Sequence, residues 1–199
     1  MVEQKPLLIK RLLNMKPNKR WRYRFGAGHF VRLPAEVTLN VGDSVSGKVL
    51  QASNAYSHVL GSTTNSNVYF QLFPNNQSVE FRLATHDGYV GLWNDPAYSG
   101  YLGVEVEWTL FRVVAGYKLA VKIGGVTKDL GTLASESVFR FNTLGRGSFE
   151  GLLWDVKVND GSVWNFPIDD GPAKNIILNV GNGGHGDAVS FTDSNWTQT

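Results

Sequence analysis

Short runs of alternating apolar and polar residues follow one another along most of this chain, with turn residues between them. In VEVEWTL, residues 104–110, every second residue is apolar. Successive side chains of a strand point to opposite faces of a sheet, so this spacing predicts a strand with one buried face. After residue 24, no segment keeps helical periodicity for more than about two turns. The sequence therefore predicts an all-β chain.

Turn signals join neighbouring runs in hairpin order. Asn159-Asp160-Gly161 separates two alternating runs, and Asp-Gly is a strong hairpin signal because Gly readily adopts positive φ. In the first of these runs, Leu152, Trp154, Val156 and Val158 are expected to face the core, and Asp169-Asp170 to lie in a turn. LPAEVTLNVGD, residues 33–43, is turn-rich. The expected strands are 29–33, 44–50, 68–73, 78–83, 104–114, 118–123, 152–158 and 163–166. Strands at this spacing without helices between them predict two packed antiparallel sheets.

Composition and length fit one sizeable domain. The chain has 199 residues and is 42% hydrophobic. It has no Cys, which excludes disulfide-stapled scaffolds, thiolate metal sites and Cys nucleophiles. The longest apolar run is far below the ~20 residues of a membrane helix, and LLIKRLL near the N-terminus is interrupted by charge. We expect neither a signal peptide nor a membrane partner.

Charge divides the chain into two parts. Residues 1–24 carry eight basic residues and one acid, a net charge of +7, whereas residues 25–199 carry 11 basic and 16 acidic residues, a net charge of −5. We therefore predict a basic N-terminal arm at 1–24 and a β-sandwich at 25–199. The arm is expected either to anchor the protein on an acidic neighbouring surface or to be a frayed terminus. Nucleic acid is not the expected partner, because the body is acidic and carries no known nucleic-acid module. The candidate anchoring residues are Lys10, Arg11, Arg20, Trp21 and Arg22.

Several segments resemble one family in order and spacing. They read FGAGHFVRLP, LNVGDSVSGKV, VLGS, VEVEWTLFRVVAGYKLAVKIGGV and FNTLGRGSFEGLLWDVKVNDGSVWNFPIDDG. Together they resemble concanavalin A-like lectin/glucanase, or laminin-G-like, jelly rolls over residues 25–199. The ending NVGNGGHGDAVSFTDSNW is similar to copies of this domain in bacteriophage virion proteins. The resemblance implies a jelly roll of two curved sheets. It does not imply one function, since members include lectins, glycan hydrolases, adhesion modules and virion proteins.

A hydrolase is not predicted. The family's glucanases carry their acids on one strand as Glu-x-Asp-x-(x)-Glu. Here Glu105-Val106-Glu107 lacks the third acid, because Trp108, Thr109 and Leu110 follow. Two glutamates on the outer face of a strand are explained by solvation.

A calcium ion at the sandwich rim is an alternative that the resemblance implies, since Ca²⁺ prefers carboxylate and carbonyl oxygens. Asp87 and Asp95 are the candidate ligands, but no Asp-rich loop of fixed spacing surrounds them. We therefore predict no required cofactor. The four His residues lie far apart, so no zinc site is expected.

The segment 85–103 concentrates aromatic and polar residues and is the candidate ligand loop. Aromatic rings suit the apolar faces of sugars, while Asp and Asn orient hydroxyl groups; the same residue types also favour protein interfaces. The alternative is that Trp93 closes one end of the sandwich. The candidate residues are Tyr89, Trp93, Asn94, Asp95, Tyr98 and Tyr101.

Together these observations favour a non-enzymatic virion protein, a head decoration or a tail adhesion domain held by its arm. Its expected partners are other virion proteins, further copies of itself and host-surface glycans. A secreted or cell-surface carbohydrate-binding module is the alternative, and an endoglucanase-like hydrolase is a third.

Overall fold

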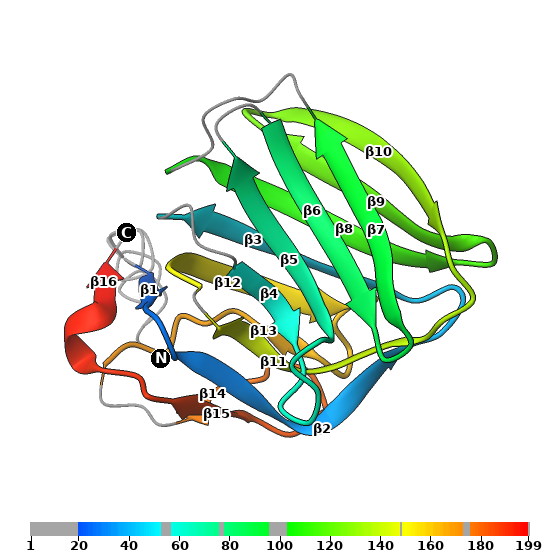
Figure 1. Ribbon diagram of the computed structural model, residues 1–199. Helices are drawn as coiled ribbons and strands as arrows, with labels where there is room; N and C mark the ends of the chain where they lie inside the picture. The colour runs from blue at the N-terminus through cyan, green and yellow to red at the C-terminus, as the bar shows by residue number, and fades with distance from the viewer. Residues whose placement is uncertain are drawn as a thin grey trace, which may run out of the picture.

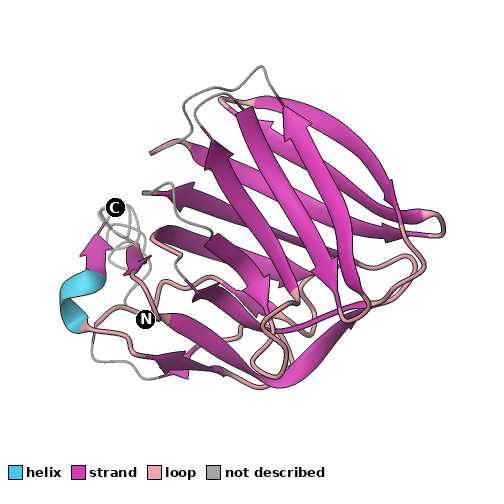
Figure 2. Cartoon of the chain, viewed as in Figure 1, coloured by secondary structure: helices cyan, strands magenta, loops and turns pink. Residues whose placement is uncertain are grey.

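Two antiparallel sheets packed face to face make up the computed structural model, which describes residues 20–52, 57–75, 78–95, 103–147, 149–172 and 176–198 (Figures 1 and 2). This confirms the predicted all-β, jelly-roll-like sandwich. Within the described ranges the one helical element is the 3₁₀ turn η1 (Asp193–Asn195). No helix there has the length and apolar character needed to span a membrane.

The first sheet has the strand order β10-β9-β8-β3-β12-β1-β16, and β13 pairs with the side of β12. Its strands are β1 (Trp21–Phe25), β3 (Ser44–Gln51), β8 (Glu105–Val113), β9 (Gly116–Ile123), β10 (Val126–Ala134), β12 (Gly151–Val158), β13 (Asn165–Phe166) and β16 (Trp196–Gln198).

The second sheet has the order β14-β15-β2-β11-β4-β5-β6-β7. Its strands are β2 (Phe30–Leu39), β4 (Ser57–Gly61), β5 (Tyr69–Asn75), β6 (Ser78–Thr85), β7 (Gly88–Asp95), β11 (Phe139–Gly147), β14 (Ile176–Ile177) and β15 (Gly186–Val189). In Figure 1, β4 to β7 lie in front of β3, β8 and β9.

Alternation along the strands fills the space between the sheets. Val45 and Val49 on β3 and Leu110 on β8 are fully buried. Each such side chain contributes roughly 1.5–3 kcal/mol through its burial. Gly47 on β3 faces Trp108 on β8, and a Cβ at Gly47 would lie 2.8 Å from the indole ring. Glycine at this position therefore makes room for the largest fully buried side chain, Trp108.

The turn-rich interpretation of residues 33–43 was wrong for most of that segment, because β2 runs unbroken through residue 39. Its pairing with β11 is irregular between Arg32 and Val37. Pro34 lies in this irregular stretch, where its missing N–H costs no ladder hydrogen bond.

The predicted core face of β12 is correct only in part. Asp155 has φ 52, and the register with β3 shifts between Trp154 and Lys157. Leu153 before this bulge and Val156 after it are both buried in the core. The bulge thus changes which residues face inward, and Trp154 lies on the outer face.

Residues 21–24, assigned above to the basic arm, belong to the sandwich. β1 pairs with β12 through Arg24 and Phe25, and with β16 through Trp21, Arg22 and Tyr23. Tyr23 and Phe25 are buried in the core. Among the described residues, the sandwich therefore includes Trp21 to Arg24 as well as Phe25. Lys10 and Arg11 lie outside the described residues.

Candidate functional site

The segment expected to be a ligand loop contains the edge strand β7. Trp93 on β7 is 3% exposed, and its indole N–H donates to the Gly131 carbonyl at 3.0 Å. Gly131 belongs to β10, so Trp93 joins the edges of the two sheets and its ring is not open to a ligand. Trp93 thus has the alternative role, in which it closes the sandwich instead of binding a ligand.

The other loop candidates do not assemble into a described site. Tyr89 is 58% exposed, and Asn94 is also exposed on the same strand. Asp95 ends β7, but its side chain lies outside the described part of the structure, as do Tyr98 and Tyr101.

The calcium candidates are likewise dispersed. Asp87 is exposed in the β6–β7 turn, where its backbone N–H donates to the Thr85 hydroxyl at 3.3 Å. Among the described residues, no three His, Asp or Glu side chains converge as a metal would require.

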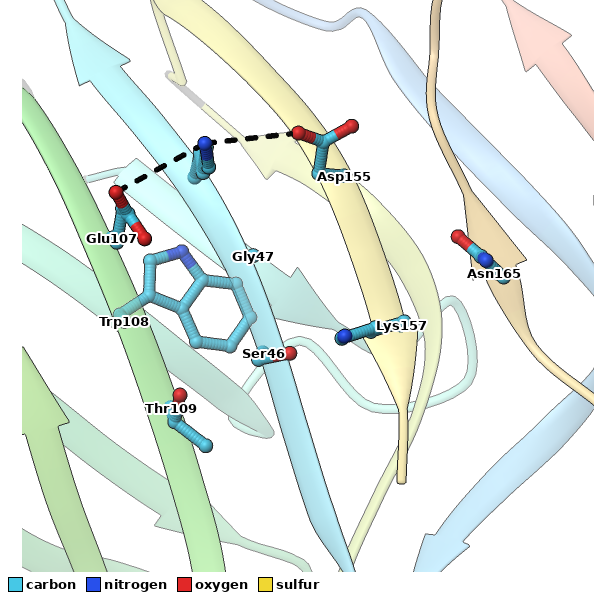
Figure 3. A pocket seen from close by; sticks show the side chains of 9 residues that line it. Ser46, Gly47, Glu107, Trp108, Thr109, Asp155, Lys157 and Asn165 are labelled. Atoms are coloured by element: carbon cyan, nitrogen blue, oxygen red, sulfur yellow. Dashed lines mark ion pairs between the residues drawn. The ribbon is translucent and has the colours of Figure 1, made fainter. Parts of the chain in front are cut away.

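A groove on the outer face of the first sheet is the candidate site. Because the inward residues of β3, β8 and β12 fill the core, the residues alternating with them point outward. The central hollow has a volume of about 470 Å³ (Figure 3). Its lining is Ser46, Gly47, Lys48, Glu107, Trp108, Thr109, Asp155, Lys157 and Asn165.

Two further hollows of about 340 and 240 Å³ share residues with the central one. Lys48 and Asp155 also line the first of them, which extends toward Arg20 and Trp154. Glu107 also lines the second, which extends toward β9. We call these three hollows together the outer groove.

Lys48 is the centre of the charge network in the outer groove. Its Nζ lies 3.8 Å from Glu105 Oε1, 3.9 Å from Asp155 Oδ2 and 4.0 Å from Glu107 Oε1; Figure 3 marks the last two pairs as dashed lines. Glu107 also pairs with Lys122 at 3.1 Å. Because the side chains are partly exposed, each pair contributes only about 0.2–1 kcal/mol to stability. The network instead fixes the positions of acceptors and donors along the groove.

The β12 bulge shapes one wall of the outer groove. It places Trp154 and Asp155 consecutively on the outer side, and the Arg22 guanidinium lies 5.3 Å from the centre of the Trp154 ring. Burial lowers the pKa of Arg22, while the Asp155 carboxylate opposes that shift. Arg22 is only 9% exposed, so it packs within the sheet. Arg20 is exposed at the groove's end, and the Trp21 side chain lies outside the described residues.

Comparison with known proteins identifies the fold. No family model matches the sequence, and no curated protein matches it. The native heptameric SAP-like pentraxin from Limulus polyphemus superposes with a TM-score of 0.53 and 11% identity, over 70% of this chain and 76% of that chain.

Two further solved structures are similar at lower scores. Domains LG4-5 of the mouse laminin alpha1 chain give a TM-score of 0.49 with 11% identity, over 71% of this chain and 41% of that chain. Chicken galectin 2 gives a TM-score of 0.42 with 15% identity, over 66% of this chain and 98% of that chain. The superposition on the pentraxin shows that the two chains share a two-sheet β-sandwich fold. The comparisons give no link to a bacteriophage.

Proposed function

We propose that the chain is a non-enzymatic, lectin-like domain whose outer groove binds an uncharged oligosaccharide. One observation carries the proposal. The central hollow contains two lysines, Lys48 and Lys157, and two carboxylates, Glu107 and Asp155, so its formal charge balances. The remaining polar groups of the lining side chains are two hydroxyls, one amide and the indole N–H of Trp108.

Hydroxyl groups of a sugar both donate and accept hydrogen bonds, and this lining offers both kinds of partner. Lysines donate, carboxylates accept, and the side chains of Ser46, Thr109 and Asn165 do both. A volume of about 470 Å³ lies within the roughly 300–1,000 Å³ of small-molecule sites. In the central hollow, a polyanion such as nucleic acid would meet the carboxylates of Glu107 and Asp155, which oppose its binding.

The position of Lys48 argues against hydrolysis in the same groove. A glycosidase places the scissile bond, or an attacking water, between two carboxyl groups. Here the Lys48 ammonium group lies within 4.0 Å of Glu105, Glu107 and Asp155. It occupies the space that such a substrate would need.

The proposal extends to the setting of the domain. We propose that it is carried on a virion, as a head decoration or tail adhesion domain, with residues 1–20 as its anchor. Its support is the resemblance of the C-terminal segment to virion proteins and the six basic residues against one acid in residues 1–20. A secreted or cell-surface binding module is the alternative. Cryo-microscopy of purified particles, with the full chain and a variant lacking residues 1–20, tests this setting; attachment of the shortened chain would refute the anchor.

Binding of oligosaccharides tests the groove itself. Thr109→Tyr places a ring in the central hollow without removing a charge, and Thr38→Tyr makes the same change on β2 of the other sheet as a control. On a panel of uncharged oligosaccharides, we expect Thr109→Tyr to weaken the recognised ligand by at least about tenfold, which is about 1.4 kcal/mol. Equal affinities for both variants, or no binding by the unmodified protein, would contradict the proposal.

A further inference from the structure

Three aliphatic side chains form an exposed row at one edge of the second sheet. β14 ends this sheet on the side away from β7 (Figure 1). Along β14 and the residues after it, burial alternates: Ile177 is fully buried and Asn179 is 4% exposed, whereas Ile176, Leu178 and Val180 are 50%, 47% and 63% exposed. We call these three exposed residues the apolar row. Exposed aliphatic residues are normally scattered singly, so a continuous row indicates a surface that another chain covers.

Carboxylates flank the apolar row. The Leu178 N–H donates to Asp170 Oδ2 at 3.2 Å, and Asp187 on β15 is the cross-strand neighbour of Ile176. Arg32 on β2 is in turn the neighbour of Asp187, so it compensates one of the two carboxylates. The edge of the sheet therefore combines aliphatic surface with negative charge.

An acidic hollow adjoins the end of the apolar row. The Val180 N–H donates to the Asn165 carbonyl at 2.9 Å, and the preceding residue, Trp164, lines a hollow of about 350 Å³. Val163 lines it too and is 47% exposed. The acids in its lining are Glu36, Asp43 and Asp160. Its lining contains neither Lys nor Arg, so this acidic hollow carries three carboxylates that no cation within it compensates.

Hydrogen bonds keep two of these carboxylates ionised at neutral pH. The Asn159 amide donates to Asp43 Oδ1 at 2.8 Å and lowers the pKa of Asp43. The Ser162 N–H donates to Asp160 Oδ1 at 2.9 Å and lowers the pKa of Asp160. The acidic hollow thus favours a cationic partner.

The N-terminal arm of this chain has the complementary composition. Residues 7–13 read LLIKRLL, five aliphatic residues around Lys10 and Arg11, and no acid follows Glu3 in the arm. The aliphatic side chains match the apolar row, and the two cations match the carboxylates beside it. Packing of one row on the row of a second copy would instead bring carboxylates of both copies together, and like charges oppose such a contact.

We infer that residues 7–13 of one copy bind the apolar row and the acidic hollow of a second copy. The row lies on the outside of a complete sandwich, so each copy folds without this contact. Each copy gives one arm and receives another, so the contact is heterologous and joins copies into rings or chains. The inference names the surface that the arm binds, and so rests on the anchoring role proposed for residues 1–20, but it does not depend on the outer groove.

Sedimentation velocity of the full chain, over a concentration series, tests the contact. Leu178→Glu and Val180→Glu each place a carboxylate in the apolar row, and the double variant Lys10→Glu/Arg11→Glu reverses the charges of the arm. Val126→Glu is the matched control, because Val126 is 55% exposed on β10, at the other edge of the sandwich. Circular dichroism establishes that each variant is folded.

We expect the unmodified protein and Val126→Glu to associate as concentration rises, and both row variants and the arm variant to associate at least about tenfold more weakly. A mixture of Leu178→Glu with Lys10→Glu/Arg11→Glu supplies an intact arm on one partner and an intact row on the other. This mixture should therefore form a dimer that does not grow further.

Three results would overturn the inference. They are association of the arm variant equal to that of the unmodified protein, absence of a dimer in the mixture, and an unmodified protein that stays monomeric. Attachment to purified particles is measured separately. Loss of attachment on deletion of residues 1–20, without association in solution, would leave the anchor standing and refute the apolar row as its partner.

Discussion

His58 makes stability depend on pH in a way that a single substitution isolates. Burial lowers its pKa from 6.5 to about 4 in the folded protein. Below about pH 6.5 the unfolded chain takes up a proton that the folded chain does not, so stability is full above this pH and falls as the pH decreases toward 4. A shift of this size corresponds to at most about 3 kcal/mol, and partial exposure of the ring reduces it to about 2 kcal/mol at pH 4.5.

The comparison is with His58→Phe, which keeps an aromatic ring against Tyr69 but does not titrate. Free energies of unfolding are measured by urea denaturation between about pH 7.5 and 4.5. The unmodified protein is expected to lose about 2 kcal/mol more than His58→Phe over this range. Burial also lowers the pKa of His29, but that contribution is common to both proteins and cancels. Parallel stability curves would refute the proposed effect of burial on His58.

Three further predictions concern the fold. A Cβ at Gly116 would lie 1.9 Å from a backbone oxygen of β10, so Gly116→Ala should prevent folding. Gly125 also has a positive φ but lies in open space, so Gly125→Ala should lower the free energy of unfolding by only about 1 kcal/mol, as measured by thermal denaturation. Equal losses in the two variants would contradict the steric argument. Trp93→Phe removes the hydrogen bond to β10 and should lower the free energy of unfolding by about 0.5–1.5 kcal/mol, with no change in oligosaccharide affinity. A loss of affinity would indicate that Trp93 contacts the ligand. Deleting residues 1–20 should leave the circular dichroism spectrum and melting temperature unchanged, whereas deleting 1–24 should unfold the sandwich by removing most of β1. A folded product of the longer deletion would place the boundary where the charge pattern put it.

The sequence predicted the strands whose alternation is uninterrupted. β3, β8 and β9 lie at the expected positions because each keeps one face in the core along its length. β10 was missed because most of its residues are exposed and show no alternation, and β14 to β16 are too short to show a period. The β12 face was partly wrong because the bulge at Asp155 depends on pairing with β3, which alternation along one strand does not show.

The candidate site was harder to predict than the fold. Aromatic residues near 85–103 suit both a ligand loop and a core, and only the contact between Trp93 and β10 distinguishes the two. The outer groove joins Lys48, Glu107 and Asp155, which are far apart in the sequence. Their proximity follows from the order β8-β3-β12, in which strands distant along the chain are neighbours. The solvent-facing Glu105 and Glu107 were the available signal of this face, but they were explained by solvation and not assigned to a site.

Mapping of backbone amide chemical shifts with a saturating uncharged oligosaccharide locates the binding site on the sheet. We expect the largest changes at Ser46, Lys48, Thr109 and Asp155, on three adjacent strands of the first sheet. Changes centred instead on β7, around Tyr89 and Asn94, would contradict it.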